Sequence, residues 1–460
     1  MSLVQTGIFI YTRRNCNAMK RIVLFVVLLV GIVSSLCWSV YRDIQIEKLY
    51  PSDLPNRVVG SRLQKDGKMP YFYKWKSADG LRYYNPQNFD TLKVSTSTAS
   101  PFFHQLLYPI ADMEQRTISR FWLFLQYVLL FIMTGIALTL TVTAGQKVAV
   151  LAIATSFLFT EAWIKVVETG QLYLFIPFLA ICCYFFLQKK KYTATAFMAG
   201  LLAVSLVLIR PNTALMFLPF FFIAGRYTMH YKITFFIPVV LLLGYIAGNE
   251  HQRALWTEYA ESLSEQLKLH QNLGPTVQQN EKDPGFAFWD GWNRAEIEAE
   301  VAKSSYVNYS ENGNVFVLVR DVFGINLSPV FLSIASFLLI SAMMLLFYFF
   351  CRKYGFHIYN LAILGFCLYM TSDLFSPIYR HQHYTVQWFF PLLLAASGYV
   401  KTYKWIYMAI VAGIILNIIN TPFIKMEHTI GEYIIFAALL LLAFVYNRPQ
   451  QLKTNFHPVH

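Results

Sequence analysis

Apolar runs long enough to cross a lipid bilayer recur from one end of the chain to the other, and no other feature constrains its fold as strongly. A transmembrane helix needs about 20 consecutive, mainly apolar residues. Charged residues make up only 14% of the 460 residues, compared with about 25% in a typical soluble protein. We therefore predict an all-α polytopic membrane protein whose residues 1–460 form one integral membrane domain.

Hydrophobic periodicity and segment length predict about twelve spans. They lie near residues 21–41, 120–143, 148–164, 171–187, 193–209, 212–225, 233–249, 327–350, 358–373, 385–400, 405–419 and 430–446. Several are short, which is typical of half-spans or tilted helices. We expect the first span, within residues 20–41, to be an anchor rather than a cleaved signal peptide, because the residues around Cys37 are a poor cleavage site.

The basic residues of the short loops alternate along the chain and so predict the orientation. One set of loops carries Lys147, Lys189–Lys191, Arg226, Lys232, Arg352, Lys353, Lys401 and Lys404, and the opposite set offers only Lys165, Arg210, Arg380 and Lys425. By the positive-inside rule both termini are cytoplasmic, and the two long loops, 42–119 and 250–326, are extracytoplasmic. The formal charge of +13 is spread over these loops, which argues against a nucleic-acid partner and favours contact with the lipid bilayer.

The two long loops carry helical patterns of their own. Pro55 to Gln64 reads as a short helix with Gly67 after its end. Leu255, Tyr259, Leu263 and Leu267 form a stripe with i, i+4 spacing on a polar helix, and Trp289, Trp292, Ile297 and Val301 are expected in a similar segment. Both segments have the pattern of interfacial helices. No cysteine lies in a long outer loop, so we predict no disulfide framework.

Polar residues gather at the predicted outer ends of several spans, where they can converge on one cavity. Asp53 and Arg57 open the first loop, and His104 lies in the segment Pro101–Pro109. The outer turns hold Lys165, Glu168 and Gly170-Gln171, then Arg210-Pro211, then Asp373, Ser376-Pro377, Arg380, His381 and His383-Tyr384.

In this order, the residues resemble the motifs of the GT-C superfamily of membrane glycosyltransferases, particularly glycosyltransferase family 87, the polyprenyl-phosphate-mannose-dependent mannosyltransferases. That family places an acidic residue after the first span, followed by a helix that ends in Gly-x-x-Pro-Tyr; this chain has Asp53 and then Gly67-Lys68-Met69-Pro70-Tyr71. Its Pro-Pro segment resembles Ser100-Pro101, with one proline missing. Its Gly-Gln, Lys/Arg-Pro and Ser-Pro plus His-Tyr motifs resemble Gly170-Gln171, Arg210-Pro211 and Ser376-Pro377 plus His383-Tyr384.

The resemblance implies a GT-C-like fold with two long extracytoplasmic loops in the plasma membrane of a bacterium. It also implies an inverting hexosyltransferase that moves a hexose, with mannose as the first candidate, from a polyprenyl-phosphate donor to an extracytoplasmic glycan or glycolipid acceptor. Asp53 would be the catalytic base, because an acceptor hydroxyl needs a carboxylate to take its proton. The donor phosphate would be bound by Arg210, Arg380, His381 and His383, and the substrates by Arg57, Glu168, Gln171 and Asp373.

No cofactor and no metal is expected. The chain contains no Asp-x-Asp pair of the kind that holds a metal–nucleotide-sugar complex, and His381 and His383 alternate, which would turn them apart on a helix. The sugar, the acceptor and the oligomeric state stay open. Rival functions are a polysaccharide polymerase or ligase with a lipid-diphosphate donor, a transporter, and a membrane scaffold.

Each candidate residue also has a structural interpretation. Asp53 could simply cap the helix at Pro55, Arg210 could extend to the membrane surface, and Glu161 could pair with Lys165 four residues later. Arg380, His381 and His383 could form a polar cluster at the interface. His104 is expected to be a structural hydrogen-bonding residue rather than a base.

Overall fold

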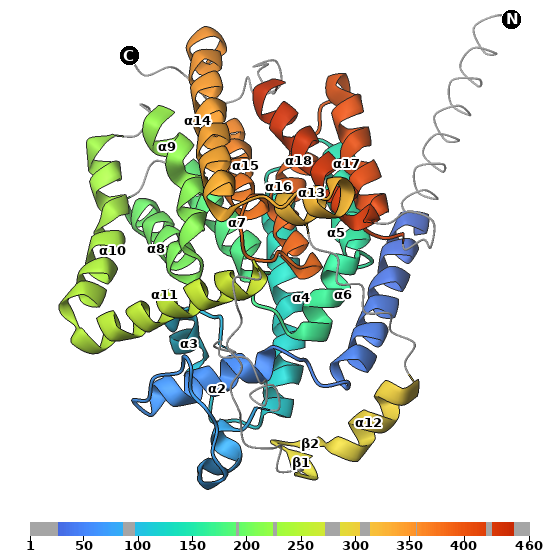
Figure 1. Cartoon of the computed structure of the whole chain (residues 1–460). Helices are drawn as coiled ribbons and strands as arrows, with labels where there is room; N and C mark the ends of the chain where they lie inside the picture. The colour runs from blue at the N-terminus through green and yellow to red at the C-terminus, as the bar shows by residue number, and fades with distance from the viewer. Residues whose placement is uncertain are drawn as a thin grey trace, which may run out of the picture.

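The computed structural model describes residues 26–85, 97–189, 193–223, 228–271, 286–303, 313–355, 357–419 and 426–445. Helices dominate these ranges (Figure 1). After a first helix, Val26–Glu47, come α2 (Leu54–Lys65), η1 (Ser77–Tyr83), α3 (Pro101–Leu107), α4 (Gln115–Thr139), α5 (Ala144–Phe157), α6 (Glu161–Thr169), α7 (Phe175–Gln188), α8 (Thr193–Ile209), η3 (Pro211–Phe217), α9 (Leu218–Ile223), α10 (Met229–Gly248) and α11 (Glu250–His270). The chain continues through β1 (Phe288–Trp289), β2 (Trp292–Asn293), α12 (Arg294–Lys303), α13 (Val315–Phe323), α14 (Pro329–Tyr354), α15 (Ile358–Leu374), η4 (Gln382–Trp388), α16 (Phe389–Ser397), η5 (Lys401–Tyr403), α17 (Lys404–Leu416) and α18 (Glu427–Val445).

The predicted all-α class is confirmed, and the number of spans stays a prediction. Within the described ranges, a helix or a pair of short helices occupies each predicted span. Among the described residues, five helices are long and apolar enough to cross a membrane: Val26–Glu47, α4, α10, α14 and α18. A sixth span is possible if α5 and α6, which meet at a bend of 52°, are counted together. The apolar helices α7, α8 and α15 have 17 residues or fewer.

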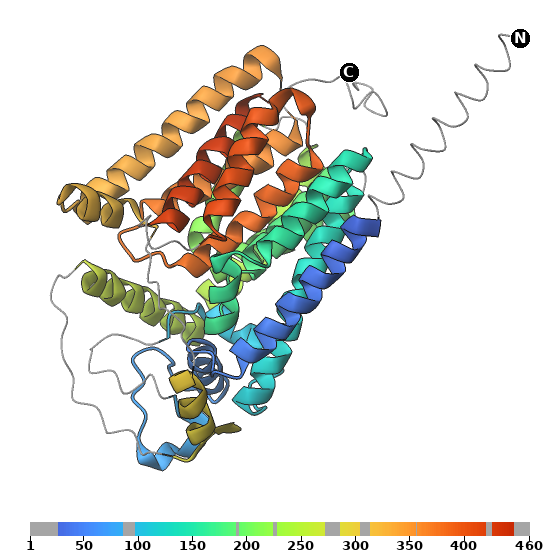
Figure 2. The same ribbon diagram turned by 90° about the vertical axis from the view of Figure 1, so that its right-hand side faces the viewer.

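The long helices form a bundle, and the segments of the two predicted outer loops gather at one end of it (Figures 1 and 2). Helix α11 lies across this end, and α2, α3, the β1–β2 hairpin and α12 lie beyond it. The arrangement leaves the ends of the bundle helices facing the polar loop segments. Polar side chains from distant parts of the chain can therefore meet there.

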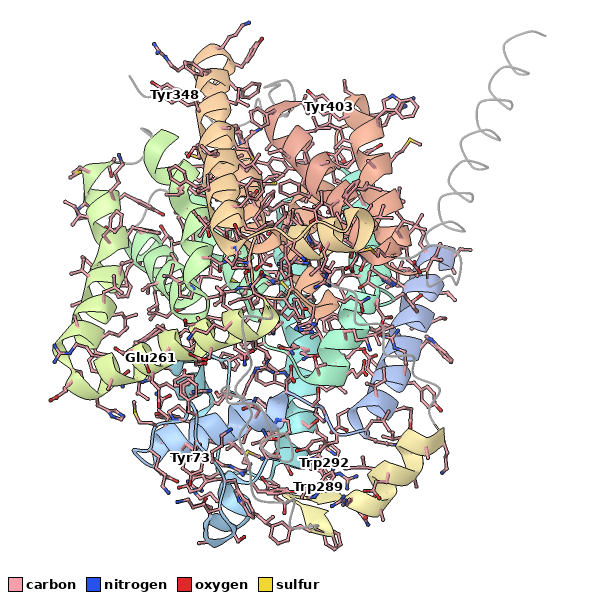
Figure 3. The ribbon with its side chains drawn as sticks, viewed as in Figure 1. Tyr73, Glu261, Trp289, Trp292, Tyr348 and Tyr403 are labelled. Carbon is pink, nitrogen blue, oxygen red and sulfur yellow. The ribbon has the colours of Figure 1, made fainter. Side chains whose placement is uncertain are left out.

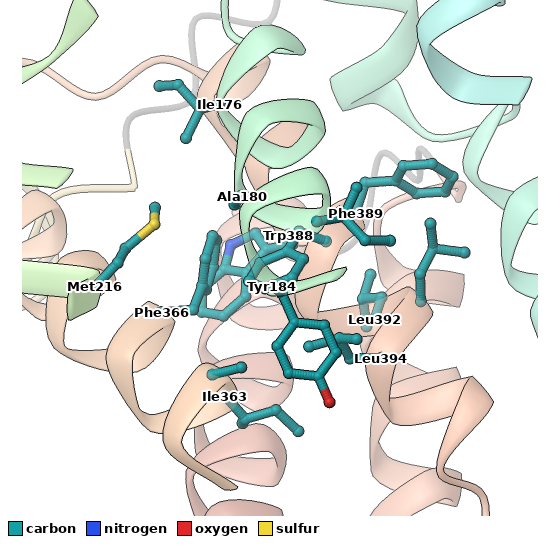
Figure 4. Close-up of a cluster of buried hydrophobic side chains, with 14 of the residues drawn as sticks. Ile176, Ala180, Tyr184, Met216, Ile363, Phe366, Trp388, Phe389, Leu392 and Leu394 are labelled. Atoms are coloured by element: carbon teal, nitrogen blue, oxygen red, sulfur yellow. The ribbon is translucent and has the colours of Figure 1, made fainter. Parts of the chain in front are cut away.

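The core of the bundle is built on α15 and α16, which are buried over almost their whole length. Phe366 and Trp388 (Figure 4) meet edge to face with their ring centroids 5.3 Å apart. The ring centroids of Phe157 and Phe389 lie 4.5 Å apart. Aromatic contacts of this kind add to the gain from burial. The packing holds both ends of the segment 375–384, which carries several of the candidate site residues.

A buried carboxylate, which the sequence did not reveal, fastens the first helix to the bundle. Asp43 is fully buried and accepts hydrogen bonds from Tyr127 Oη at 2.6 Å and Trp163 Nε1 at 2.7 Å. Arg42 lies beside it and forms an ion pair with it at 2.7 Å. A buried charge that is paired and hydrogen-bonded on several sides is tolerated at low cost. These contacts fix the position of the end of the first helix, from which the chain continues to Asp53.

The loop segments agree with the sequence in two helices and differ at Trp289 and Trp292, whereas Ile297 and Val301 lie on a helix, α12, as predicted. Helix α2 runs from Leu54 to Lys65, close to the predicted range of 55–64, and α11 contains the predicted apolar stripe. Trp289 and Trp292, however, lie on the short strands β1 and β2 and not on a helix (Figure 3). The physical reason is the intervening Asp290-Gly291, whose φ angles of 45° and 88° form the two-residue turn that a hairpin requires.

Candidate active site

Asp53 stands at the N-terminal end of α2 but does not cap it. Its side chain makes no capping hydrogen bond. Gln171 Nε2 donates to Asp53 Oδ2 instead, and Ser52 Oγ lies 3.4 Å from Oδ1. The carboxylate is 36% exposed. The structural interpretation of Asp53 as a helix cap is therefore not supported by its geometry, and the group is open to a ligand.

Gly170 makes the contact between Asp53 and the turn after α6 possible. It ends α6 in the left-handed conformation, with φ of 64°, which costs a residue with a side chain about 1–2 kcal/mol. A Cβ atom at this position would lie 2.6 Å from Cβ of Leu54, the residue after Asp53. The close approach also brings Asp53 N within 3.1 Å of Thr169 O. The Gly170-Gln171 turn thus sets the position of the carboxylate.

Arg57 joins the same cluster from the next turn of α2. It is buried and donates to Gln171 Oε1 at 2.5 Å and to Gly170 O at 3.3 Å. Its Nη2 atom lies 3.8 Å from Asp53 Oδ2. Arg57 Nε has no hydrogen-bond partner among the described residues. Gln171 therefore bridges the arginine and the carboxylate, with its oxygen toward one and its nitrogen toward the other.

Glu168 lies in the last turn of α6, just before Gly170, but it pairs with a residue outside the Asp53 cluster. Its carboxylate pairs with Lys165 at 2.6 Å, and Lys165 also lies 3.9 Å from Glu161. The predicted pairing of Glu161 and Lys165 is present, but Glu168 is the nearer acid. Glu168 and Lys165 are only partly buried, so a ligand could still reach them.

A second cluster of charges lies where η3, α15 and α18 meet. Asp373 is buried and accepts hydrogen bonds from Arg210 Nη2 and from Arg380 Nε, the latter at 2.7 Å. Arg380 also donates to Glu432 Oε2 at 2.5 Å, and Trp388 Nε1 donates to Glu432 Oε1. Arg380 is fully enclosed by these contacts, whereas Arg210 is partly exposed. Arg210 Nη1 has no partner among the residues described.

Aromatic rings pack around the guanidinium of Arg210. Its guanidinium carbon lies 4.9 Å from the ring centre of Tyr384 and 5.2 Å from that of Tyr173. The His383 ring stacks on Tyr173 at 5.4 Å, and His381 stacks on His383 at the same centroid separation. Rings over a guanidinium fix its plane and attract its charge.

The pKa values of the two histidines are affected by charged residues of both clusters. Burial lowers the pKa of His383 well below its usual value, and the charges of His381, Arg57, Arg380 and Arg210 act in the same direction. Burial also lowers the pKa of His381, while the carboxylate of Asp53 opposes that shift. Both imidazoles are therefore neutral at pH 7 and can donate a hydrogen bond without carrying charge.

The structure thus brings together most of the residues that the sequence singled out. Asp53, Arg57 and Gln171 form one cluster, and Arg210, Asp373 and Arg380 form the other, with His381 and His383 between them. Tyr173 and Glu432 complete the site but were not predicted, and Tyr384 was singled out only as part of the His383-Tyr384 motif. A signal for Glu432 was present, because it is a lone acid inside an apolar run.

Two further predictions concern groups near the site. His104 is fully buried, its Nε2 lies 3.1 Å from Ser97 Oγ, and its ring packs 5.8 Å from that of Tyr71. This environment agrees with the structural role predicted for it. Across the described ranges, no three histidine, cysteine, aspartate or glutamate side chains are placed so that they could hold a metal ion.

Comparison with known proteins adds one match. The model of glycosyltransferase family 87 matches residues 98–282, which include Gly170-Gln171 and Arg210. The match confirms the resemblance to this family and implies a glycosyltransferase. Asp53 and the segment 373–384 lie outside the matched range. No curated protein and no solved structure matches the chain.

Proposed function

We propose that this membrane glycosyltransferase moves a hexose, with mannose as the first candidate, from a polyprenyl-phosphate donor to a glycan or lipid acceptor on the extracytoplasmic side. One observation carries the proposal: an accessible carboxylate that is not used as a helix cap stands 3.8 Å from Arg57, and His381 and His383 lie between it and the pair Arg210 and Arg380. A transferase with a lipid-phosphate donor needs both a base and cations near each other at a membrane face.

Asp53 is the base in this mechanism. Gln171 holds Oδ2 by donating to it, which leaves Oδ1 as the oxygen that accepts the proton of the acceptor hydroxyl. The hydroxyl oxygen forms a bond to the anomeric carbon of the sugar while the bond from that carbon to the phosphate oxygen breaks. The bonding electrons leave with the lipid phosphate. A single displacement of this kind inverts the anomeric configuration.

Arg210 is the proposed ligand of the donor phosphate. It has a free N–H direction at Nη1, and its other side is held by Asp373. A guanidinium that is fixed before the substrate arrives stabilises the charge of the departing phosphate at little cost of reorganisation. His381 and His383 would add neutral donors. Arg380 and Asp373 would act through Arg210, since both are enclosed by their own ion pairs.

The acceptor would approach from the side of Arg57 and Glu168. Arg57 Nε is unpaired within the described part of the chain, and Glu168 is accessible at the edge of the same turn. Hydrogen bonds from such groups would orient the hydroxyl toward Asp53. Orientation of two reactants in one site accounts for a large part of enzymatic rate enhancement.

The test is the donor requirement of the purified protein. In lipid nanodiscs it should transfer hexose from a short-chain polyprenyl-phosphate hexose to glycolipids extracted from the native membrane, and a chelator should have little effect. The lipid-diphosphate sugar is the comparison that represents the rival polymerase or ligase. Transfer from a soluble nucleotide sugar without lipid carrier, or from the diphosphate alone, would contradict the proposal.

A further inference from the structure

A polar cavity, separate from the two clusters around Asp53 and Arg210, lies at the outer end of the first helix. It has a volume of about 420 Å³, which is within the range of small-molecule sites. Its walls come from three parts of the chain that are distant in sequence: the end of the first helix, the start of α4, and strand β2 with the adjoining helix α12. Such a cavity has no role in the mechanism derived above.

The lining of this cavity combines hydrogen-bond donors, acceptors and apolar surface. Lys48 and Arg116 are cationic, Glu296 and Glu300 are acidic, and Gln45 and Asn293 are amides; Leu49, Trp292 and Ile297 supply apolar surface, and Lys303 lies at the edge. Lys303 is paired with Glu300 at 3.3 Å. Arg116 lies over the Trp292 ring at 5.4 Å from its centre. These contacts hold the walls in place.

This combination favours a sugar over an anionic headgroup. A sugar hydroxyl both donates and accepts hydrogen bonds, so it can use carboxylates, amides and cations together, and the C–H faces of its ring can pack on apolar side chains. A phosphate group could use the donors of Lys48 and Arg116, but it would leave the acceptors of the two glutamates unused and would be repelled by their charges. Glu296, Glu300 and Lys303 follow one another at helical spacing, so one face of α12 presents both acceptors and a donor to the cavity.

The cavity also lies within reach of Asp53. Leu49 lines it, and Asp53 follows four residues later. Four residues span at most about 14 Å even when fully extended. Between them, Tyr50 adopts φ of 59° and packs edge to face on Trp289 and Trp292 at 5.5 and 5.4 Å. The tyrosine therefore packs the hairpin, which carries the lining residue Trp292, against the segment that leads to the carboxylate.

We infer that this cavity is an acceptor subsite for the glycan part of the acceptor, which binds a hydroxyl-rich saccharide whose growing end reaches Asp53. The inference rests on the proposed function for the identity of Asp53 as the base, and it deepens that function by making the acceptor a glycan rather than a bare lipid. A glycan bound in this cavity would be held through sugar residues that do not take part in the reaction.

Photo-crosslinking tests the subsite in the intact membrane protein. A photoreactive amino acid replaces Glu300, whose side chain is 50% exposed and lines the cavity; the control replaces Glu298, which is 62% exposed on α12 and does not line it. After illumination of native membranes, mass spectrometry identifies the adducts. We expect severalfold more saccharide adduct at position 300 than at 298, as a ladder spaced by one sugar residue. A phospholipid adduct at 300, or equal saccharide adducts at both positions, would overturn the inference.

The same experiment in the Asp53→Asn background separates the subsite from the transfer reaction. Saccharide adducts at position 300 that persist while transfer is lost support both the subsite and the base. If Asp53→Asn transfers sugar normally and the adducts still form, the subsite stands and the base assignment fails. If transfer is lost and no saccharide adduct forms at 300 in either background, the subsite fails and the base assignment stands.

Discussion

Replacement of Asp53 by asparagine should abolish transfer without unfolding the protein. Asparagine keeps the shape of the side chain and can still accept the hydrogen bond from Gln171, but it cannot take a proton. Loss of a general base typically lowers the rate by about 10²–10⁴-fold. We therefore expect transfer to fall by at least about 100-fold, with donor binding close to that of the wild type.

The effect on stability should be small for reasons that the structure gives. The side chain makes no capping hydrogen bond, and asparagine is about as good a cap as aspartate. The ion pair with Arg57 is long, at 3.8 Å, and its carboxylate is 36% exposed, so its loss should cost less than about 1 kcal/mol. Thermal unfolding in detergent measures this term independently of activity.

Asp112→Asn is the matched control. Asp112 lies in the same loop and pairs with Lys65 and Arg82. Its side chain is more exposed than that of Asp53, and neither of its ion-pair partners belongs to the candidate site. Its replacement removes the same charge and should leave transfer unchanged. If Asp53→Asn transferred sugar at a near-normal rate, the reasoning about the base would be refuted, and only the family match and the arginine cluster would support a transferase.

Three further variants test other parts of the site. Arg210→Lys keeps the charge but loses the planar fork, so KM for the donor should rise at least several-fold in a transfer assay, while Arg294→Lys, whose arginine also meets a carboxylate and a ring, should be neutral. Gly170→Ala should destabilise by about 1–2 kcal/mol from its left-handed backbone and about 1–3 kcal/mol from the clash with Leu54. Gly67 has φ of 72° and open space around it. Gly67→Ala should therefore show only the destabilisation caused by the left-handed backbone when thermal unfolding is measured. Burial, aided by Arg57, lowers the pKa of His104 to about 3. The unfolded chain therefore binds more protons between pH 6.5 and 3, and the stability decreases as the pH is lowered through that window, by up to about 1.4 kcal/mol per pH unit. His104→Gln should lose this part of the fall in unfolding temperature between pH 7.5 and 5, and an unchanged slope would contradict the assignment.

The sequence predicted the helices well because their signals are local. Apolar periodicity over a dozen or more residues specifies a helix wherever it lies, and Pro55 with Gly67 marked the ends of α2. The segment around Trp289 was mispredicted because aromatic and aliphatic residues were assigned to a helix across Asp290-Gly291. That dipeptide is itself a strong hairpin signal, and here its turn preference outweighs the helical spacing of the apolar residues on either side.

The site was only partly predictable, because many of its contacts join residues that lie 52 to 163 positions apart in the sequence. Motif order identified Gln171 and Asp53 as candidates, but nothing in the sequence shows that Gln171 binds Asp53 and Arg57 at once. The position of Arg380 is another example. Its enclosure by Asp373 and Glu432 depends on how α15 and α18 pack, and this makes it a support of Arg210 in the proposed mechanism rather than an exposed phosphate ligand.

The charges of the two clusters explain how one proton transfer could assist both halves of the proposed reaction. Three arginines, Arg57, Arg210 and Arg380, face three carboxylates, Asp53, Asp373 and Glu432, so the resting site is neutral. Burial also keeps the imidazoles of His381 and His383 uncharged. When Asp53 accepts the proton of the acceptor, the site gains one net positive charge. This gain coincides with the growth of negative charge on the departing phosphate, and a low-dielectric site strengthens their attraction. The base and the arginine cluster would therefore act on one transition state, because the charge that Asp53 loses is the charge that had partly neutralised Arg57.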